Sequence, residues 1–273
     1  MLTGLTALAS SPLLRAQPAG RPDVLVIGAG LSGLYTATIL EEMGAKVQVI
    51  EGRQRIGGRL YTRFDLPGHP EVGGNSMAAG YGRTIVLARR LGLELIDYAP
   101  RTYGGPPPAL VMNGDIIDVS QWPDSPHNPL PQAHRELMPW QLLPSRLKGA
   151  NPLKQAVDWL DPAHADLDIP LYDWLRAQGI TDSEIALAYD TAPYYGDSAR
   201  SVSALMYLFN TRWTQEQIAL GPQSFAVAGG NQRLPQAMAA SLKREVLLGK
   251  EVVAIESFPG HARVTLRDGS HLD

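Results

Sequence analysis

Three glycines and one glutamate are spaced in a pattern that suits phosphate and ribose binding. Gly28, Gly30 and Gly33 form G-x-G-x-x-G, and Glu51 follows 18 residues after the last of them. In such a pattern the first glycine permits a tight turn, the second lets the backbone approach a pyrophosphate, and the third lets a helix pack closely on a strand. A carboxylate at Glu51 can accept hydrogen bonds from ribose hydroxyls and repels a 2′-phosphate. The pattern therefore favours a dinucleotide other than NADP.

The elements expected around these residues have the order strand, turn, helix, strand. The continuous apolar run at 23–27 predicts a central parallel strand buried on both faces, 31–43 predicts a helix, and 46–50 predicts the second strand. The helix would begin at Leu31 and Ser32, where free backbone N–H groups and the positive end of the dipole can meet a phosphate. Ser32 is expected to cap the helix or to donate to that phosphate. A structural glycine turn with an incidental acid is the alternative.

A second glycine- and arginine-rich segment, EGRQRIGGR at 51–59, follows directly. Its pair Gly57 and Gly58 lets the backbone approach a cofactor, and its arginines, including Arg53 and Arg59, can neutralise a pyrophosphate. A basic solvated loop is the alternative, but it would not explain the paired glycines. The segment resembles the E-x-R-x-R-x-G-G-R signature of the flavin-containing amine oxidases, which include monoamine, polyamine and L-amino acid oxidases. This resemblance implies FAD, rather than NAD, as the cofactor.

Two further segments extend the resemblance. Residues 71–95 resemble the family's Gly-Gly segment, which places Gly73, Gly74 and Asn75 among the expected cofactor-binding residues. Venom-type L-amino acid oxidases tend to carry an arginine for the substrate carboxylate just after this pair, so Asn75 favours amines over amino acids. Residues 228–242 resemble the G-G-x-x-x-L-P stretch, and the strand after them implies a contact from Val253 to the adenine side of FAD. The alternative is that Val252 and Val253 only pack in a buried strand, which requires no ligand.

The resemblance implies an α/β fold: a Rossmann-like FAD-binding domain with a parallel sheet and an inserted mixed α+β substrate domain, with the C-terminal part missing. The expected divisions are a signal-like segment at 1–20, the first part of the FAD-binding domain at 21–98, a largely helical, partial substrate domain at 99–220, and a truncated return to the FAD-binding domain at 221–273.

Several local features are expected in the two later ranges. Asn113 and Gly114 predict a hairpin turn, and helices are expected near 133–143 and 153–160. Thr181 begins a capping box, and residues 201–213 predict a long helix. Tyr194, Tyr195 and Trp213 are candidates to line an apolar pocket, although aromatic residues at helical spacing usually belong to a core.

The first twenty residues resemble a signal peptide. An apolar run from Leu2 to Leu14 precedes the small residue Ala16 and a Pro/Gly linker, although no basic segment comes before it. The expectation is a periplasmic or secreted protein. The alternative is a frayed apolar terminus of a cytoplasmic protein.

Composition excludes several other functions. The formal net charge of −3 gives no footprint for nucleic acid, and the absence of cysteine excludes disulfides and thiolate chemistry. No metal-binding histidine motif, hydrolase G-x-S-x-G elbow, Walker lysine pattern or spanning apolar stretch occurs. The expected partners are a small amine or amino acid and O₂, without a metal. A complementing C-terminal chain or a homodimer is also considered.

The reaction that the resemblance implies is oxidation of an amine C–N bond. Hydride passes to flavin N5, O₂ is the acceptor, the imine is hydrolysed, and H₂O₂ and ammonia are released. The chain ends four residues after Gly269 of the expected Asp268–Gly269 turn, before a returning strand is expected. The favoured hypothesis is therefore an N-terminal part of such an oxidase, with the catalytic residues beyond 273. A subunit of a split or processed oxidase and a non-catalytic nucleotide-binding remnant are the alternatives, and other flavoenzymes such as carotenoid desaturases or protoporphyrinogen oxidase also stay open.

Overall fold

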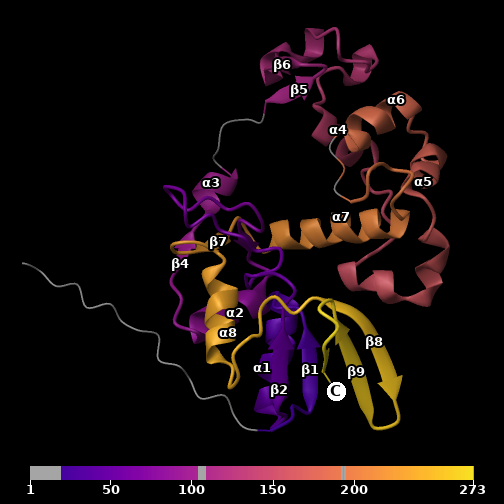
Figure 1. Cartoon of the computed structure of the whole chain (residues 1–273). Helices are drawn as coiled ribbons and strands as arrows, with labels where there is room; N and C mark the ends of the chain where they lie inside the picture. The colour runs from indigo at the N-terminus through magenta and orange to yellow at the C-terminus, as the bar shows by residue number, and fades with distance from the viewer. Residues whose placement is uncertain (1–19, 104–108, 192, 194, 273) are drawn as a thin grey trace, which may run out of the picture. The chain divides into compact units, whose positions relative to one another are not determined.

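The computed structural model describes residues 20–103, 109–191, 193 and 195–272. The fold is mixed α/β, and the chain divides into two compact units, shown in Figure 1. Unit 1 comprises Met1–Met77, Tyr81–Tyr98 and Ser224–Asp273, and unit 2 comprises Ala78–Gly80 and Ala99–Gln223. Nearly all of the signal-like segment lies outside the described residues, so export stays a prediction. No helix in the described part of the chain is long and apolar enough to cross a membrane.

Unit 1 begins with two parallel strands joined by a helix. β1 (Val24–Ile27) pairs with β2 (Val47–Ile50), and α1 (Leu31–Glu42) connects them, as predicted. Parallel neighbours need such a crossover because the chain must return to the same end of the sheet. Leu34 and Ala37 bury the inner face of α1.

The burial of these strands corrects one prediction. β1 is not buried on both faces, because only Val26 is buried and Ile27 is 46% exposed. β2 is the strand buried throughout. A later segment lies along its second edge: Leu247 forms a parallel bridge to Ile50, and its backbone N–H donates to Val49 O at 3.0 Å. The interior position therefore belongs to β2.

The rest of unit 1 completes its core. β3, β7 and β4 form a sheet in that order, β4 and β7 being antiparallel, and β8, β9 and β10 form an antiparallel sheet. One cluster gathers buried side chains of β1, α1, β2 and α8, among them Leu34, Val49 and Met238. The remaining elements of unit 1 are β3 (Met77–Ala78), α2 (Gly82–Arg90), β4 (Leu95–Asp97), β7 (Ser224–Val227), α8 (Arg233–Ser241), β8 (Val252–Phe258), β9 (His261–Leu266) and β10 (His271–Leu272).

The C-terminal strands differ from the prediction in two ways. The strand expected directly after 228–242 begins later, because β8 starts only at Val252, after a turn at Gly249 with φ +68°. A returning strand does form after the Asp268–Gly269 turn, contrary to expectation. In it, His271 pairs with Thr265. Two residues suffice because the turn aligns them with the exposed edge of β9.

Unit 2 is mainly helical with one hairpin. Asn113 and Gly114, with φ of 52° and 90°, turn β5 into β6 as predicted. The helices near 133–143 and 153–160 are shorter than expected, since Pro139 starts α4 and the second range forms only a 3₁₀ segment. The other elements of unit 2 are α3 (Ala99–Tyr103), β5 (Leu110–Met112), β6 (Asp115–Ile117), η1 (Val119–Asp124), η2 (Gln132–His134), α4 (Pro139–Arg146), η3 (Ala156–Leu160), η4 (Pro162–Leu167), α5 (Leu171–Ala177), α6 (Asp182–Ile185), η5 (Ala186–Asp190) and α7 (Ala204–Ala219).

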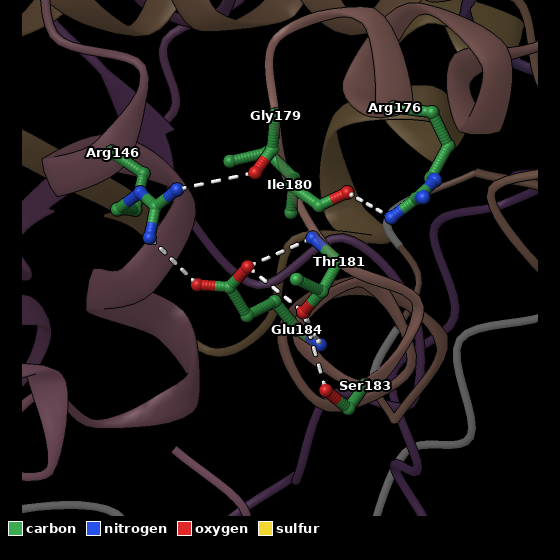
Figure 2. A network of polar contacts seen from close by, with 7 residues as sticks. All are labelled: Arg146, Arg176, Gly179, Ile180, Thr181, Ser183 and Glu184. Carbon is green, nitrogen blue, oxygen red and sulfur yellow. Dashed lines mark hydrogen bonds and ion pairs between the residues drawn. The ribbon is translucent and has the colours of Figure 1, made fainter. Parts of the chain in front are cut away.

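A capping box links two helices of unit 2. Thr181 Oγ1 accepts a hydrogen bond from the backbone of Glu184, and Glu184 Oε2 accepts the backbone N–H of Thr181, as the sequence predicts. The other carboxylate oxygen of Glu184 pairs with Arg146 of α4 at 2.9 Å (Figure 2). A π-helical segment, η5, continues from α6.

Candidate functional site

The first glycine turn leaves the start of α1 open. Gly28 has φ +103°, a conformation that residues with a Cβ rarely adopt. A Cβ on Gly33 would lie 2.1 Å from Gly28 O, so helix and turn are in the close contact expected. The N-cap is Gly30, which provides no side-chain cap. Ser32 is exposed and does not cap this end, and the first N–H groups of the helix, including that of Leu31, have no partner within the helix.

Glu51 lies directly beside this turn, at the end of β2. Its Oε2 accepts the backbone N–H of Ala29 at 2.9 Å, and its Oε1 accepts that of Arg53 at 2.9 Å. The carboxylate therefore joins the glycine turn to the next loop. It is partly buried, so its remaining lone pairs can accept further hydrogen bonds.

The second glycine pair packs against the first turn. Gly57 forms a parallel bridge with Gly30, and its N–H donates to Ala29 O at 2.9 Å. A Cβ on Gly58 would approach the Gly30 Cα to 3.2 Å. These two loops can therefore run side by side only because both are glycine-rich.

The arginines of the second loop have different roles. The guanidinium groups of Arg53 and Arg59 are exposed and form no hydrogen bond or ion pair with other described residues. Arg55 instead donates to Gly58 O at 2.8 Å and to Leu60 O at 3.3 Å, and it lies 4.4 Å from the ring centroid of Tyr61. Arg55 therefore holds the loop, which leaves Arg53 and Arg59 available for an anion.

The Gly73–Gly74 segment adjoins this loop. A Cβ on Gly73 would lie 2.1 Å from Arg59 O, and Gly74 N–H donates to the same oxygen at 3.1 Å. Asn75 is exposed, with its Oδ1 accepting a hydrogen bond from Ser76 at 3.3 Å. The backbone of this segment is thus brought to the second glycine loop.

Two buried amides that the sequence did not single out hold these loops together. Asn231 donates from Nδ2 to Gly74 O at 3.0 Å. Gln232 donates from Nε2 to Ile56 O at 2.9 Å and accepts the N–H of Thr62 at 3.0 Å. Asn231 and Gln232 are 4% and 5% exposed. The sequence does place this polar pair between two glycines and an apolar helical segment. Its partners, however, lie 157 to 176 residues away in the chain.

Val253 differs from its prediction in burial. It lies in β8 and is 53% exposed, so the strand is not buried there. The neighbouring Glu251 lies against the site, because a Cβ on Gly52 would be 3.5 Å from its Cα. The structure thus places 28–33 against 51–59, and Gly73 and Gly74 against Arg59 of the second loop. Val253 is not part of these contacts.

Unit 2 contains a hollow of about 680 Å³ between α4, η5 and α7. Tyr195 and Trp213, which the sequence suggested as pocket residues, do not line it, and Tyr194 lies outside the described residues. Burial raises the pKa of Tyr189 above its usual value, and its hydroxyl donates to Tyr195 O at 2.9 Å. The aromatic residues of the lining are Trp140, Tyr189 and Tyr207.

The residues of unit 1 fit an anionic nucleotide such as FAD. An uncapped helix start, two guanidinium groups without partners among the described residues, and a carboxylate beside a glycine turn match its pyrophosphate and ribose. The described part of the chain holds no group of three or more His, Asp or Glu side chains placed to bind a metal. The fold is therefore mixed α/β, and the glycine loops with Glu51 have the chemistry that nucleotide binding requires.

Comparison with known proteins gives the family. Residues 31–273 match the model of the flavin containing amine oxidoreductases, and the chain belongs to this family, whose members bind FAD. It is 28% identical over 265 residues to the "Putative flavin-containing monoamine oxidase AofH" of Mycobacterium tuberculosis, covering 90% of this chain and 54% of that protein. It is 45% identical over 73 residues to amine oxidase [flavin-containing] A of Sus scrofa, which is 26% of this chain and 14% of that protein.

Solved structures share the fold. The cyclohexylamine oxidase of Brevibacterium oxydans superposes with a TM-score of 0.66 at 24% identity, covering 93% of this chain and 56% of that one. A putrescine oxidase bound to putrescine gives a TM-score of 0.59 at 23% identity, with 93% and 56% covered. Where the match covers most of this chain, it covers only about half of the relative. The chain therefore spans about half the length of these relatives.

Proposed function

We propose that unit 1 binds FAD and that the protein takes part in the oxidation of an amine at its C–N bond. The single observation that carries the proposal is the Glu51 carboxylate, which lies against the glycine turn at the uncapped start of α1. This proposal includes the Rossmann-like character of the β1–α1–β2 unit. Membership of the family supports it.

Each group would meet a different part of the cofactor. The backbone N–H groups of 31–33 would face the pyrophosphate, Glu51 would accept from the ribose, and Arg53 and Arg59 would balance the phosphate charge. The close contact of Gly30 with Gly58 leaves backbone, rather than side chains, facing the cofactor. Asn231 and Gln232 would hold the glycine loops in place without touching it.

When bound, FAD supplies the two-electron acceptor for the oxidation. The contribution of unit 2 is to present the amine in a hollow from which water is partly excluded. The range 99–220 would then act as the substrate-binding part, and 21–98 with 221–273 as the cofactor-binding part. Amines are favoured over amino acids because Asn75 is uncharged.

The test is FAD binding by the full 273-residue chain, measured by isothermal titration calorimetry for wild type, Glu51→Arg and Glu94→Arg. Glu94 is exposed in the same unit, so its replacement makes the same charge change away from the site. We expect Glu51→Arg to weaken binding by at least about tenfold, because a charge-assisted hydrogen bond is lost and a cation replaces it. Glu94→Arg should bind like wild type.

A wild-type chain without measurable FAD affinity, or equal affinity of wild type and Glu51→Arg, would refute the assignment. Glu51→Gln supplies a check on folding, since it keeps an acceptor for one of the two backbone N–H groups. The FAD affinity of Glu51→Gln should fall between those of wild type and Glu51→Arg.

A further inference from the structure

A second, smaller hollow in unit 2 is lined by residues from the end of α4, from α5 and from α7. Its volume is about 300 Å³, at the lower end of the range of about 300–1,000 Å³ that small-molecule sites occupy. Lys148 follows the end of α4, Trp174 belongs to α5, and Arg212 belongs to α7. Three separate segments of the chain therefore form the walls of this smaller hollow.

Among the described residues, two cations and no carboxylate line the smaller hollow. The Lys148 ammonium forms no hydrogen bond or ion pair with another described residue. The Arg212 guanidinium donates from Nε to Leu153 O at 2.8 Å, and its two other nitrogen atoms have no partner in the described part of the chain. Acidic residues outnumber basic ones in 99–223, so the composition of this segment does not explain a purely cationic lining.

Trp174 adds a hydrogen-bond donor that is nearly buried and unpaired. The residue is 7% exposed, and its indole N–H donates to no described residue. Buried polar groups in proteins are nearly always hydrogen-bonded. Every fully enclosed side-chain nitrogen and oxygen in the described residues has a partner, so the indole nitrogen must be reached from open space. The smaller hollow, which Trp174 lines, provides that space.

The rest of the lining is mostly apolar. Leu143, Leu147 and Leu208 contribute hydrocarbon surface, and covering such surface with an apolar ligand is favourable. The amide of Asn151 is already engaged, because its Nδ2 donates to Leu208 O at 2.8 Å and its Oδ1 accepts the N–H of Leu153 at 3.0 Å. The unpaired donors are therefore the two cations and the indole.

The larger hollow of about 680 Å³ differs in charge. Tyr207 and Thr211 line both hollows, but no charged side chain occurs among the described residues that line the larger one. An anion brought into the larger hollow would lose water without gaining an opposite charge, which is costly. The two hollows therefore favour ligands of different charge.

We propose that the smaller hollow is a binding site for a small organic carboxylate with a compact hydrocarbon body. Arg212 and Lys148 would donate to the carboxylate oxygens, because charge-assisted hydrogen bonds are roughly twice as strong as neutral ones. The Trp174 N–H would donate to the same group, and the leucines would cover the hydrocarbon. The proposal concerns unit 2 alone and goes beyond the proposed function.

The experiment titrates the full chain with benzoate, benzamide and sulfate by isothermal titration calorimetry. Benzamide has nearly the shape of benzoate without its charge, whereas sulfate has negative charge without a hydrocarbon body. We expect benzoate to bind at least about tenfold more tightly than either of the other two, because only benzoate satisfies both the cations and the apolar walls.

Variants locate the binding. Lys148→Glu should weaken benzoate at least about tenfold, because the carboxylate then meets a like charge. Lys154→Glu makes the same charge change and is the matched control, since Lys154 is an exposed lysine of the same unit that does not line the smaller hollow. Arg212→Gln should weaken benzoate at least about fivefold. Glu51→Arg should leave benzoate binding unchanged, because Glu51 lies in unit 1.

A spectroscopic readout reports on the bound carboxylate directly. In a chain labelled with ¹⁵N-tryptophan, the indole N–H signal of Trp174, assigned with Trp174→Phe, should move downfield when benzoate is added, because the N–H gains an acceptor. Trp122 is the internal reference, since its indole N–H already donates to Leu137 O at 2.8 Å and it does not line the smaller hollow. Circular dichroism would show that each variant is folded.

The inference is overturned if benzamide or sulfate binds as tightly as benzoate, if Lys148→Glu and Lys154→Glu bind benzoate equally, if the Trp174 indole signal stays in place, or if benzoate does not bind. Those results would leave FAD binding and the effect of Glu51→Arg on it intact. Selective benzoate binding by a chain that fails to bind FAD would refute the proposed function alone. The two proposals therefore fail separately.

Discussion

At the scale of single residues, Gln232 illustrates how a buried amide can fix the shape of a distant loop. Replacing it with alanine leaves Thr62 N–H and Ile56 C=O without their partners. We expect Gln232→Ala to lower the free energy of unfolding by about 2 kcal/mol or more, because each unsatisfied buried group costs about 1–3 kcal/mol. Urea unfolding measures the change. The exposed Gln236→Ala, one turn later in α8, is the control and should stay within about 0.5 kcal/mol of wild type.

A second prediction at this scale concerns Asp65. Its hydrogen bond to Arg63 lowers the pKa of the Asp65 carboxyl from 3.8 to about 2. Because the pKa in the folded state is the lower one, the contribution to stability is present above about pH 4 and is lost as the pH falls toward 2. Carboxyl NMR titration should give the low value in wild type and a value near 3.8 in Arg63→Ala. A low pKa retained in that variant would contradict the assignment.

At the scale of elements, the contact between α1 and the glycine turn can be tested with one methyl group. Gly33→Ala would place a Cβ 2.1 Å from Gly28 O, so helix and turn must separate. We expect a loss of about 3 kcal/mol in the free energy of unfolding, together with weaker FAD binding. Gly82→Ala, at the start of α2, meets open space and should change stability by less than about 1 kcal/mol. Similar unfolding midpoints for the two variants would argue against close packing at Gly33.

The capping box of α6 supports a second prediction about an element (Figure 2). Glu184 is 3% exposed and satisfies both Thr181 and Arg146. Glu184→Ala should cost about 3 kcal/mol of unfolding free energy, because it removes a cap and leaves a partly buried guanidinium without its partner. Glu184→Gln should cost less, and the exposed Glu136→Ala should cost almost nothing. Denaturant unfolding would rank the three variants.

Local elements were predictable from the sequence, and long-range pairings were not. Periodicity and turn residues predicted β1, α1, β2 and the Asn113 hairpin close to their actual bounds, because neighbouring residues determine these features. The long helix was expected at 201–213, whereas α7 begins at Ala204 and continues to Ala219. The burial of β1 was predicted wrongly, since burial depends on the strands beside it. Leu247 pairs with the second edge of β2 although it lies almost 200 residues further along the chain. No local sequence pattern encodes such a pairing.

The candidate site was predictable in the same uneven way. The glycines and Glu51 were identified because backbone geometry demands glycine and the ribose demands an acid at a fixed distance along the chain. The different role of Arg55, which holds the loop while Arg53 and Arg59 stay exposed, was not predictable. All three residues are arginines in one short segment and differ only in their contacts. Whether the identified residues contact FAD stays a prediction.

At the scale of the whole molecule, the two units make a prediction about independent folding. Residues 99–223 form one continuous segment with their own core, including Leu171, Ile180 and Leu208. The core of unit 1, in contrast, includes Val227 and Leu234, which follow this segment in the sequence. We therefore expect a 99–223 fragment to unfold cooperatively, whereas 1–223 should form no stable unit 1. Circular dichroism melts and the dispersion of amide NMR signals would decide, and a disordered 99–223 fragment would contradict the prediction.

The chain leaves unit 1 after β4 and returns to it at β7, and these two strands are neighbours. Asp97 pairs with Phe225, and Tyr98 N–H donates to Ser224 O at 2.8 Å. The ends of the 125-residue excursion are therefore already held together by unit 1, so the entropy of closing this large loop depends only weakly on its length. Evolution, or a protein engineer, can exchange the whole segment between 98 and 224 for another folded module while unit 1 keeps its sheet. In this architecture a complete module can be acquired by transplantation, without rebuilding unit 1 residue by residue.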